Sequence, residues 1–63
     1  MKAKNLKYNK EYKIGNGDCT YTYRGLTGKA LHFWQREDGI VIDNFSIKIS
    51  DFNKEMADVT TLI

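Results

Sequence analysis

Proline is absent from the 63-residue chain, and cysteine and histidine occur once each, as Cys19 and His32. A single cysteine excludes an internal disulfide, and one cysteine with one histidine cannot supply the four ligands of a Cys/His zinc site. Small domains that fold without disulfides are typical of reducing compartments. We therefore expect a cytoplasmic protein, and nothing in the sequence points to a metal or another cofactor.

Long apolar segments are also absent. No apolar run approaches the roughly 18 residues that a membrane-spanning helix needs, so we expect no membrane contact. The lysine-rich start of the chain is not followed by the apolar segment of a secretory signal. The net charge of +2 is too small to indicate nucleic-acid binding by itself.

The charges are unevenly distributed along the chain. Residues 1–13 carry five lysines and one glutamate, whereas residues 37–63 carry six acidic residues and two lysines. This polarity is typical of a soluble protein whose charges pair internally, and it also fits a basic arm that binds a partner. We expect residues 1–10 to form a polar, lysine-rich arm and residues 11–63 to form one folded domain.

Alternating apolar and polar residues predict an all-β fold. The alternation, with β-branched and aromatic residues, is clearest in residues 19–24 and 29–36. We also predict strands at 12–14, 40–49 and 59–63, with the last pairing with the first, and turns at 15–18, 25–28 and 37–39. Ser50 or Asp51 is predicted to cap a short helical turn near residues 51–56.

The same pattern predicts which side chains are buried. Eight of 63 residues are aromatic, and their large rings must supply most of the core of so short a chain. Phe52, Met56 and Val59 follow the i, i+4, i+7 spacing of a helix face. The expected core is Ile14, Cys19, Tyr21, Tyr23, Leu31, Phe33, Ile40, Ile42, Phe45, Ile47, Ile49 and Phe52.

Four short motifs follow one another in a particular order: Tyr21-Thr22-Tyr23-Arg24-Gly25, His32-Phe33-Trp34, Asp38-Gly39 and Ser50-Asp51-Phe52. Their order resembles that in small SH3-like barrel proteins of phages and other bacterial mobile elements. The resemblance implies a small five-stranded SH3-like barrel over residues 11–63 and a non-enzymatic accessory role, with no site residues carried over. A three- or four-stranded meander under a C-terminal helix at residues 51–62 is the alternative fold.

Possible catalytic groups are few. The Gly15-Asn16-Gly17 segment lacks the rest of a phosphate-binding loop and fits a hairpin turn. Cys19 and His32 could form a nucleophilic pair, but we expect Cys19 in the core and His32 on the opposite face of its strand. The acidic residues at 37, 38 and 43 lie on a turn and its exit, not across a cleft. We therefore expect a protein that is not an enzyme.

The strongest candidate site is a cluster of aromatic and basic side chains. Trp34 shares a strand face with His32 and Arg36, and Arg24 and Lys29 lie on either side of the neighbouring turn. Tryptophan and arginine are enriched in protein-interface hot spots, and aromatic rings beside cations also bind single-stranded nucleic acids. Trp34 could instead fill the core, against an aromatic residue of a neighbouring strand.

These observations favour a small accessory or regulatory protein that binds another protein through this aromatic-basic strand face. The alternative is a module that binds RNA or single-stranded DNA through the same residues, with phosphate contacts that weaken as salt rises. We expect a monomer, or a homodimer that pairs the first or last strand with that of a second copy.

Overall fold

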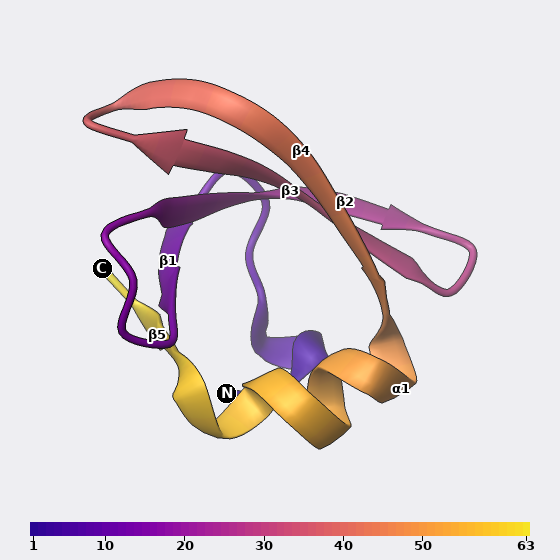
Figure 1. Ribbon diagram of the computed structural model, residues 1–63. Coiled ribbons are helices and arrows are strands. Elements are labelled where there is room, and N and C mark those ends of the chain that lie inside the picture. The colour runs from indigo at the N-terminus through magenta and orange to yellow at the C-terminus, as the bar shows by residue number, and fades with distance from the viewer.

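Five antiparallel strands form where apolar and β-branched residues alternate (Figure 1). The computed structural model describes all residues, 1–63. The strands are β1 (Glu11–Ile14), β2 (Thr20–Thr27), β3 (Ala30–Glu37), β4 (Ile40–Lys48) and β5 (Thr60–Leu62). About half of the chain is strand, which confirms the predicted mostly β fold.

The strands make one sheet in the order β4-β3-β2-β1-β5. β5 pairs with β1, in a register that places Tyr12 opposite Leu62, so the predicted pairing of the last strand with the first is confirmed. The sheet is curved but not closed, and β4 and β5 are its two edges. Because β1 has a neighbour on each side, β5 and not β1 presents an edge to a second chain.

Short turns connect the strands where glycine and aspartate predict them. Asp38 and Gly39 both take positive φ, 53° and 80°, and form the predicted two-residue turn between β3 and β4. The segment 15–18 also turns the chain, between β1 and β2. The N–H group of Gly15 donates to the carbonyl of Val59, 2.9 Å away, which ties this turn to the residue before β5.

The turn predicted at residues 25–28 is shorter than expected. β2 continues to Thr27, and residues 28 and 29 alone connect it to β3. Gly25, at a φ of 104°, sits in a bulge where the register shifts after Tyr23. The bulge bends β2 without ending it, because glycine adopts this backbone conformation without steric strain.

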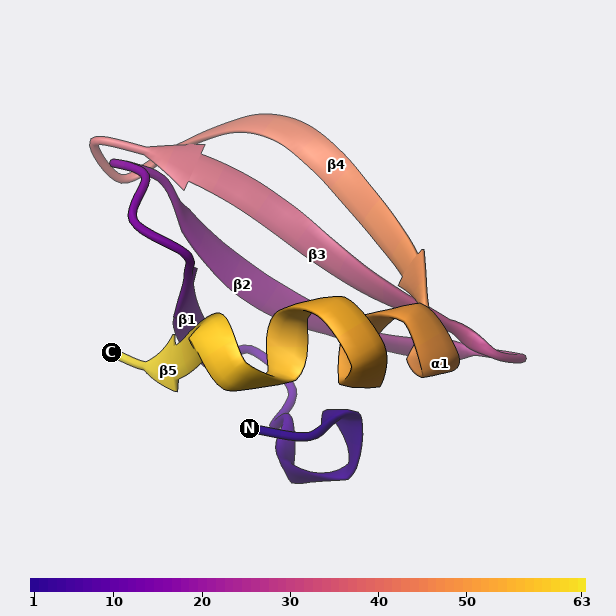
Figure 2. The same cartoon turned by 60° about the horizontal axis from the view of Figure 1, so that its bottom comes forward.

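A helical segment spans the opening between the two edge strands (Figures 1 and 2). It consists of an α-helical turn α1 (Ile49–Asp51), a π-helical turn η2 (Phe52–Met56) and a 3-10 turn η3 (Ala57–Val59). The predicted cap by Ser50 or Asp51 is wrong, because the segment begins directly after Lys48 and no side chain caps its N-terminus. No helix in the structure has both the length and the apolar character that crossing a bilayer requires.

The π-helical turn changes which side chains of this segment are buried. The N–H group of Ala57 donates to the carbonyl of Phe52, five residues earlier instead of four. Phe52 and Ala57 are both buried, Met56 is half-buried, and Val59 is 47% exposed. The predicted i, i+4, i+7 face is therefore wrong at Val59, since it assumes α-helical geometry throughout.

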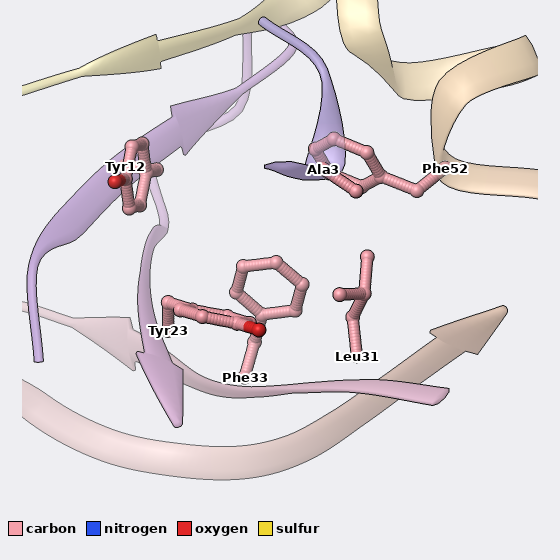
Figure 3. Packing of buried hydrophobic residues seen from close by; sticks show 6 residues of the cluster. All are labelled: Ala3, Tyr12, Tyr23, Leu31, Phe33 and Phe52. Carbon is pink, nitrogen blue, oxygen red and sulfur yellow. The ribbon is translucent and has the colours of Figure 1, made fainter. Parts of the chain in front are cut away.

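Phe33 lies at the centre of the core (Figure 3). The centroid of its ring lies 5.4 Å from that of Tyr23 and 6.1 Å from that of Phe52. Two of the core residues, Ala3 and Tyr12, are missing from the expected core, although Tyr12 shares a strand face with Ile14. Ala3 comes from a 3-10 turn, η1 (Ala3–Asn5), in the lysine-rich segment. The core cluster is Ala3, Tyr12, Tyr23, Leu31, Phe33 and Phe52.

Ile40 and Ile42, two residues of the predicted core, are instead exposed, by 67% and 51%. β4 is an edge strand, and its first half extends with the β3–β4 turn away from the helical segment (Figure 1). The register shifts between Gln35 and Arg36, which leaves Ile42 as an extra residue of β4. Six further residues of the predicted core are half-buried instead of fully buried: Ile14, Cys19, Tyr21, Phe45, Ile47 and Ile49.

We predict that Phe52→Ala lowers the free energy of unfolding by about 3–5 kcal/mol, because it removes a fully buried ring that stacks on Phe33. Val59→Ala serves as the control and should cost less than about 1 kcal/mol, because this side chain is already half exposed. Chemical denaturation followed by circular dichroism measures both values. A comparable loss in the two variants would show that the helix buries residue 59 and lacks the π-helical turn.

Tyr23 makes the stability depend on pH in the alkaline range. Burial, with a smaller contribution from the neighbouring Tyr12, raises the pKa of the Tyr23 hydroxyl above its ordinary value of 10.0. The folded state therefore holds this proton more tightly than the unfolded chain does. The resulting stabilisation is complete below about pH 10 and is lost as the pH rises through the folded-state pKa.

We therefore expect the melting temperature to fall above about pH 10, and to fall less steeply in Tyr23→Phe, which has no hydroxyl to ionise. Thermal melts across the alkaline range measure the slope for both proteins. The same slope in the two proteins would contradict this assignment to Tyr23.

Candidate binding face on the sheet

The outer face of the sheet carries most of the predicted site. Tyr23, Phe33 and Phe45 are paired across β2, β3 and β4 and point into the core. The next residues along β2 and β3 point to the other side, because side chains alternate along a strand. Trp34 is half-buried there, and its cross-strand neighbours are Thr22 and Asn44. Its interpretation as a core residue packed against an aromatic neighbour is therefore wrong.

Four side chains alternate between aromatic rings and guanidinium groups on this face. The guanidinium carbon of Arg24 lies 4.7 Å from the ring centroid of Tyr8 and 4.0 Å from that of Trp34. The guanidinium carbon of Arg36 lies 5.6 Å from the Trp34 centroid. These distances fall within the range of cation–π attraction. We refer to Tyr8, Arg24, Trp34 and Arg36 as the aromatic–guanidinium stack.

The bulge in β2 and the lysine-rich segment together position Arg24. The N–H group of Asn9 donates to the carbonyl of Tyr23, 2.8 Å away, which joins the segment to β2. The Asn9 side-chain oxygen accepts a hydrogen bond from Arg24. A Cβ atom on Gly25 would lie 3.8 Å from the ring of Tyr8, so this ring packs directly over the bulge. Arg24 is thus enclosed between the segment and Trp34.

The positive charges of the stack have uncharged hydrogen-bond partners. Arg36 donates through Nε to the hydroxyl of Thr22, at 2.9 Å, and through Nη1 to the carbonyl of Gly39, at 3.0 Å. Arg24 donates to the side-chain amide oxygen of Asn9. These bonds orient both guanidinium groups without neutralising them. Both charges therefore remain available to an anionic group of a partner.

His32 and Lys29 differ in their relation to the stack. His32 lies on the same face as Trp34, with its Nδ1 atom 2.9 Å from the Ser46 hydroxyl. Lys29 lies in the turn between β2 and β3, five residues from Trp34, and lines a separate hollow with Lys48. The structure thus brings together four of the five predicted residues on one face, and Lys29 is not among them.

Tyr8 is a part of the stack that the sequence does not reveal. It precedes β1 and has no periodic relation to Arg24 or Trp34, so no spacing in the chain connects them. A single aromatic ring within a lysine-rich segment was its one distinguishing feature. The contact depends on the bulge at Gly25, which strand alternation does not predict.

An exposed apolar segment borders the stack. Val41 is paired with Arg36 across the sheet and is 42% exposed. Ile40 and Ile42, on either side of it, are more exposed still. The guanidinium group of Arg36 beside the exposed side chain of Val41 combines charge with apolar surface. This combination is typical of surfaces that bind other proteins.

The candidate catalytic pair does not come together. The Sγ atom of Cys19 accepts a hydrogen bond from the Gln35 amide at 3.3 Å, whereas His32 contacts Ser46 on the outer face. No group of three or more histidine, cysteine or acidic residues is arranged to hold a metal ion. The candidate binding face is therefore characterised by its stacked aromatic rings and by the charges of Arg24 and Arg36.

Comparison with known protein families, curated proteins and solved structures finds no match to this chain. The resemblance to SH3-like barrel proteins of mobile elements thus stays a prediction from the motifs. The function must be inferred from the arrangement of the side chains.

We predict that Arg24→Gln exposes Trp34, because the guanidinium group that covers its ring at 4.0 Å is removed. The emission of this single tryptophan should shift to longer wavelength, and acrylamide should quench it more efficiently. The free energy of unfolding should fall by only about 0.5–1 kcal/mol, the usual value of an exposed cation–π contact. Lys48→Gln, which removes the same charge from a strand position outside the stack, is the control. Equal quenching in the two variants would contradict the stacked arrangement.

Proposed function

We propose that this chain is a non-catalytic interaction module that binds another protein through the aromatic–guanidinium stack. The supporting observation is the pair of guanidinium groups of Arg24 and Arg36, both held against the half-buried ring of Trp34 by uncharged partners. Such groups are already ordered before binding, so less side-chain entropy is lost on association. An ordered cluster of tryptophan and arginine is the usual composition of an interface hot spot.

The partner surface is proposed to be acidic, with an apolar part beside it. Carboxylates would complete the hydrogen bonding of Arg24 and Arg36, whose intramolecular partners are neutral. Apolar side chains of the partner would cover Val41, which is paired with Arg36. This composition favours a protein partner over a nucleic acid, which offers phosphates but no aliphatic side chains.

Binding of single-stranded nucleic acid is a second candidate, supported by the same two guanidinium groups and by His32 on the same face. It requires open aromatic faces on which bases can stack. The Trp34 ring already contacts Arg24 and Arg36, so less of it is free for a base. For this reason the protein-binding function ranks first.

We also propose that the curved sheet is an open form of the SH3-like barrel that the motifs resemble. The return of β5 to β1 and the helical segment across the gap between the edge strands support this assignment. An accessory or regulatory role in the cytoplasm follows from the same resemblance and from the lack of disulfides.

The proposed function predicts that the tagged protein retains a protein partner from a lysate of the source cells after nuclease treatment. Arg24→Gln combined with Arg36→Gln should abolish retention of that partner, because both anion-binding groups are lost. Lys7→Gln combined with Lys10→Gln removes the same charge from exposed positions outside the stack and should retain it. Circular dichroism establishes that both double variants are folded.

Equal retention by the two double variants would contradict the proposed face. Trp34 fluorescence, titrated with a single-stranded oligothymidylate at low salt, tests the second candidate. A response that weakens steeply as salt rises, together with loss of the retained material on nuclease treatment, would replace protein binding with nucleic-acid binding.

A further inference from the structure

A hollow of about 460 Å³ lies on the opposite side of the sheet from the stack, between the lysine-rich segment, the β2–β3 hairpin and α1. Its floor is apolar and consists of Leu6, Leu26, Leu31 and Ile49. The volume is within the range of small-molecule binding sites. A second hollow, lined by Lys29 and Lys48, shares Ile49 and Asn53 with it. We refer to the first as the apolar hollow.

The charges around the apolar hollow have one sign. Lys2 and Lys4 line it directly, and Lys29 and Lys48 line the adjoining hollow. Neither lining contains an aspartate or a glutamate. Two lysines thus line the apolar hollow and two more line its neighbour, without an acidic residue in either lining. This arrangement is complementary to a ligand that is anionic at one end and apolar along its length.

The wall of the hollow supplies a hydrogen-bond donor. Tyr23 is 8% exposed and lines the hollow, and its hydroxyl points toward Leu31, another lining residue (Figure 3). None of the side-chain hydrogen bonds within the chain involves this hydroxyl. Burial raises the pKa of this hydroxyl above its ordinary value of 10.0. No buried side-chain oxygen of the chain lacks a partner, so this hydroxyl is open to the hollow, where a ligand can accept its hydrogen bond.

The lysine-rich segment is held in place over the hollow. The N–H group of Ala3 donates to the side-chain oxygen of Asn53 at 2.8 Å, which fixes η1 against the helical segment. The N–H group of Lys7 donates to the hydroxyl of Tyr12, also at 2.8 Å. These two bonds lie on either side of Lys4 and Leu6. The site is therefore largely formed before a ligand arrives, which reduces the entropy that binding costs.

We propose that the apolar hollow binds a medium-chain carboxylate, with its alkyl chain on the leucine and isoleucine floor and its carboxylate between the lysines and the Tyr23 hydroxyl. The site is independent of the proposed function, because its residues face the inner side of the sheet and the stack faces the outer side. Substitutions that abolish binding at the apolar hollow should therefore leave binding at the stack intact, and the reverse should also hold.

Calorimetric titration of the whole chain with hexanoate, octanoate and decanoate, each kept below its micelle-forming concentration, tests this proposal. Each added methylene group should tighten binding about fourfold until the floor is covered. Decanol and decylammonium, which match the chain but lack the negative charge, should bind more weakly than decanoate. Methyl resonances of Leu6, Leu26 and Leu31 should shift on binding, whereas the emission of Trp34 should not change.

Variants separate the contributions of the hydroxyl and the lysines. Tyr23→Phe keeps the ring and should weaken decanoate binding about tenfold, the usual effect of losing a hydrogen bond to a charged group. Lys2→Gln combined with Lys4→Gln should also weaken it, and Lys7→Gln combined with Lys10→Gln is the matched control outside the hollow. Affinities that do not depend on chain length, equal binding of decylammonium, or resonance shifts elsewhere in the chain would overturn the proposal.

Discussion

Phe33 and Phe52 stack with their ring centroids 6.1 Å apart, and this contact joins the sheet to the helical segment that covers it. Phe33 also contacts Tyr23 and Phe45, so β2, β3, β4 and the helical segment meet at one ring. Because side chains alternate along β3, an inward Phe33 requires an outward Trp34. The packing of the core therefore determines which residues are presented to a partner, and the stack on the outer face is a consequence of the aromatic cluster within.

The open edge of the sheet explains both candidate sites. A sheet that does not close leaves space between its strands and the helix, and one turn of the lysine-rich segment enters this space and buries Ala3. The space that remains becomes the apolar hollow. On the outer face, the bulge at Gly25 bends β2 around the core and brings the Tyr8 ring over Arg24. Strand curvature, imposed by a small core, thus shapes both surfaces.

Local sequence patterns were sufficient to predict the strands, the Asp38–Gly39 turn and the pairing of β5 with β1, because each depends on alternation or on a residue that tolerates positive φ. They also placed Trp34 and Arg36 on one face. They failed where the outcome depends on contacts distant in sequence. Ile40 and Ile42 have the composition of buried strand residues, yet the helical segment does not reach them, and the π-helical turn at Phe52 leaves no periodic trace.

The lysine-rich segment connects these features. It contributes Ala3 to the core, Tyr8 to the stack and two lysines to the apolar hollow, so its residues serve two surfaces that face opposite ways. A chain of 63 residues without a disulfide buries little apolar surface, so each packing contact matters for its stability. The lysine-rich segment packs on both sides of the sheet and therefore stabilises the fold more than its few apolar atoms would suggest. The lysines can remain exposed there because the backbone and side-chain bonds to Tyr23, Tyr12 and Asn53 hold the segment in place. The lysine-rich segment is therefore held on the sheet by packing and by these hydrogen bonds.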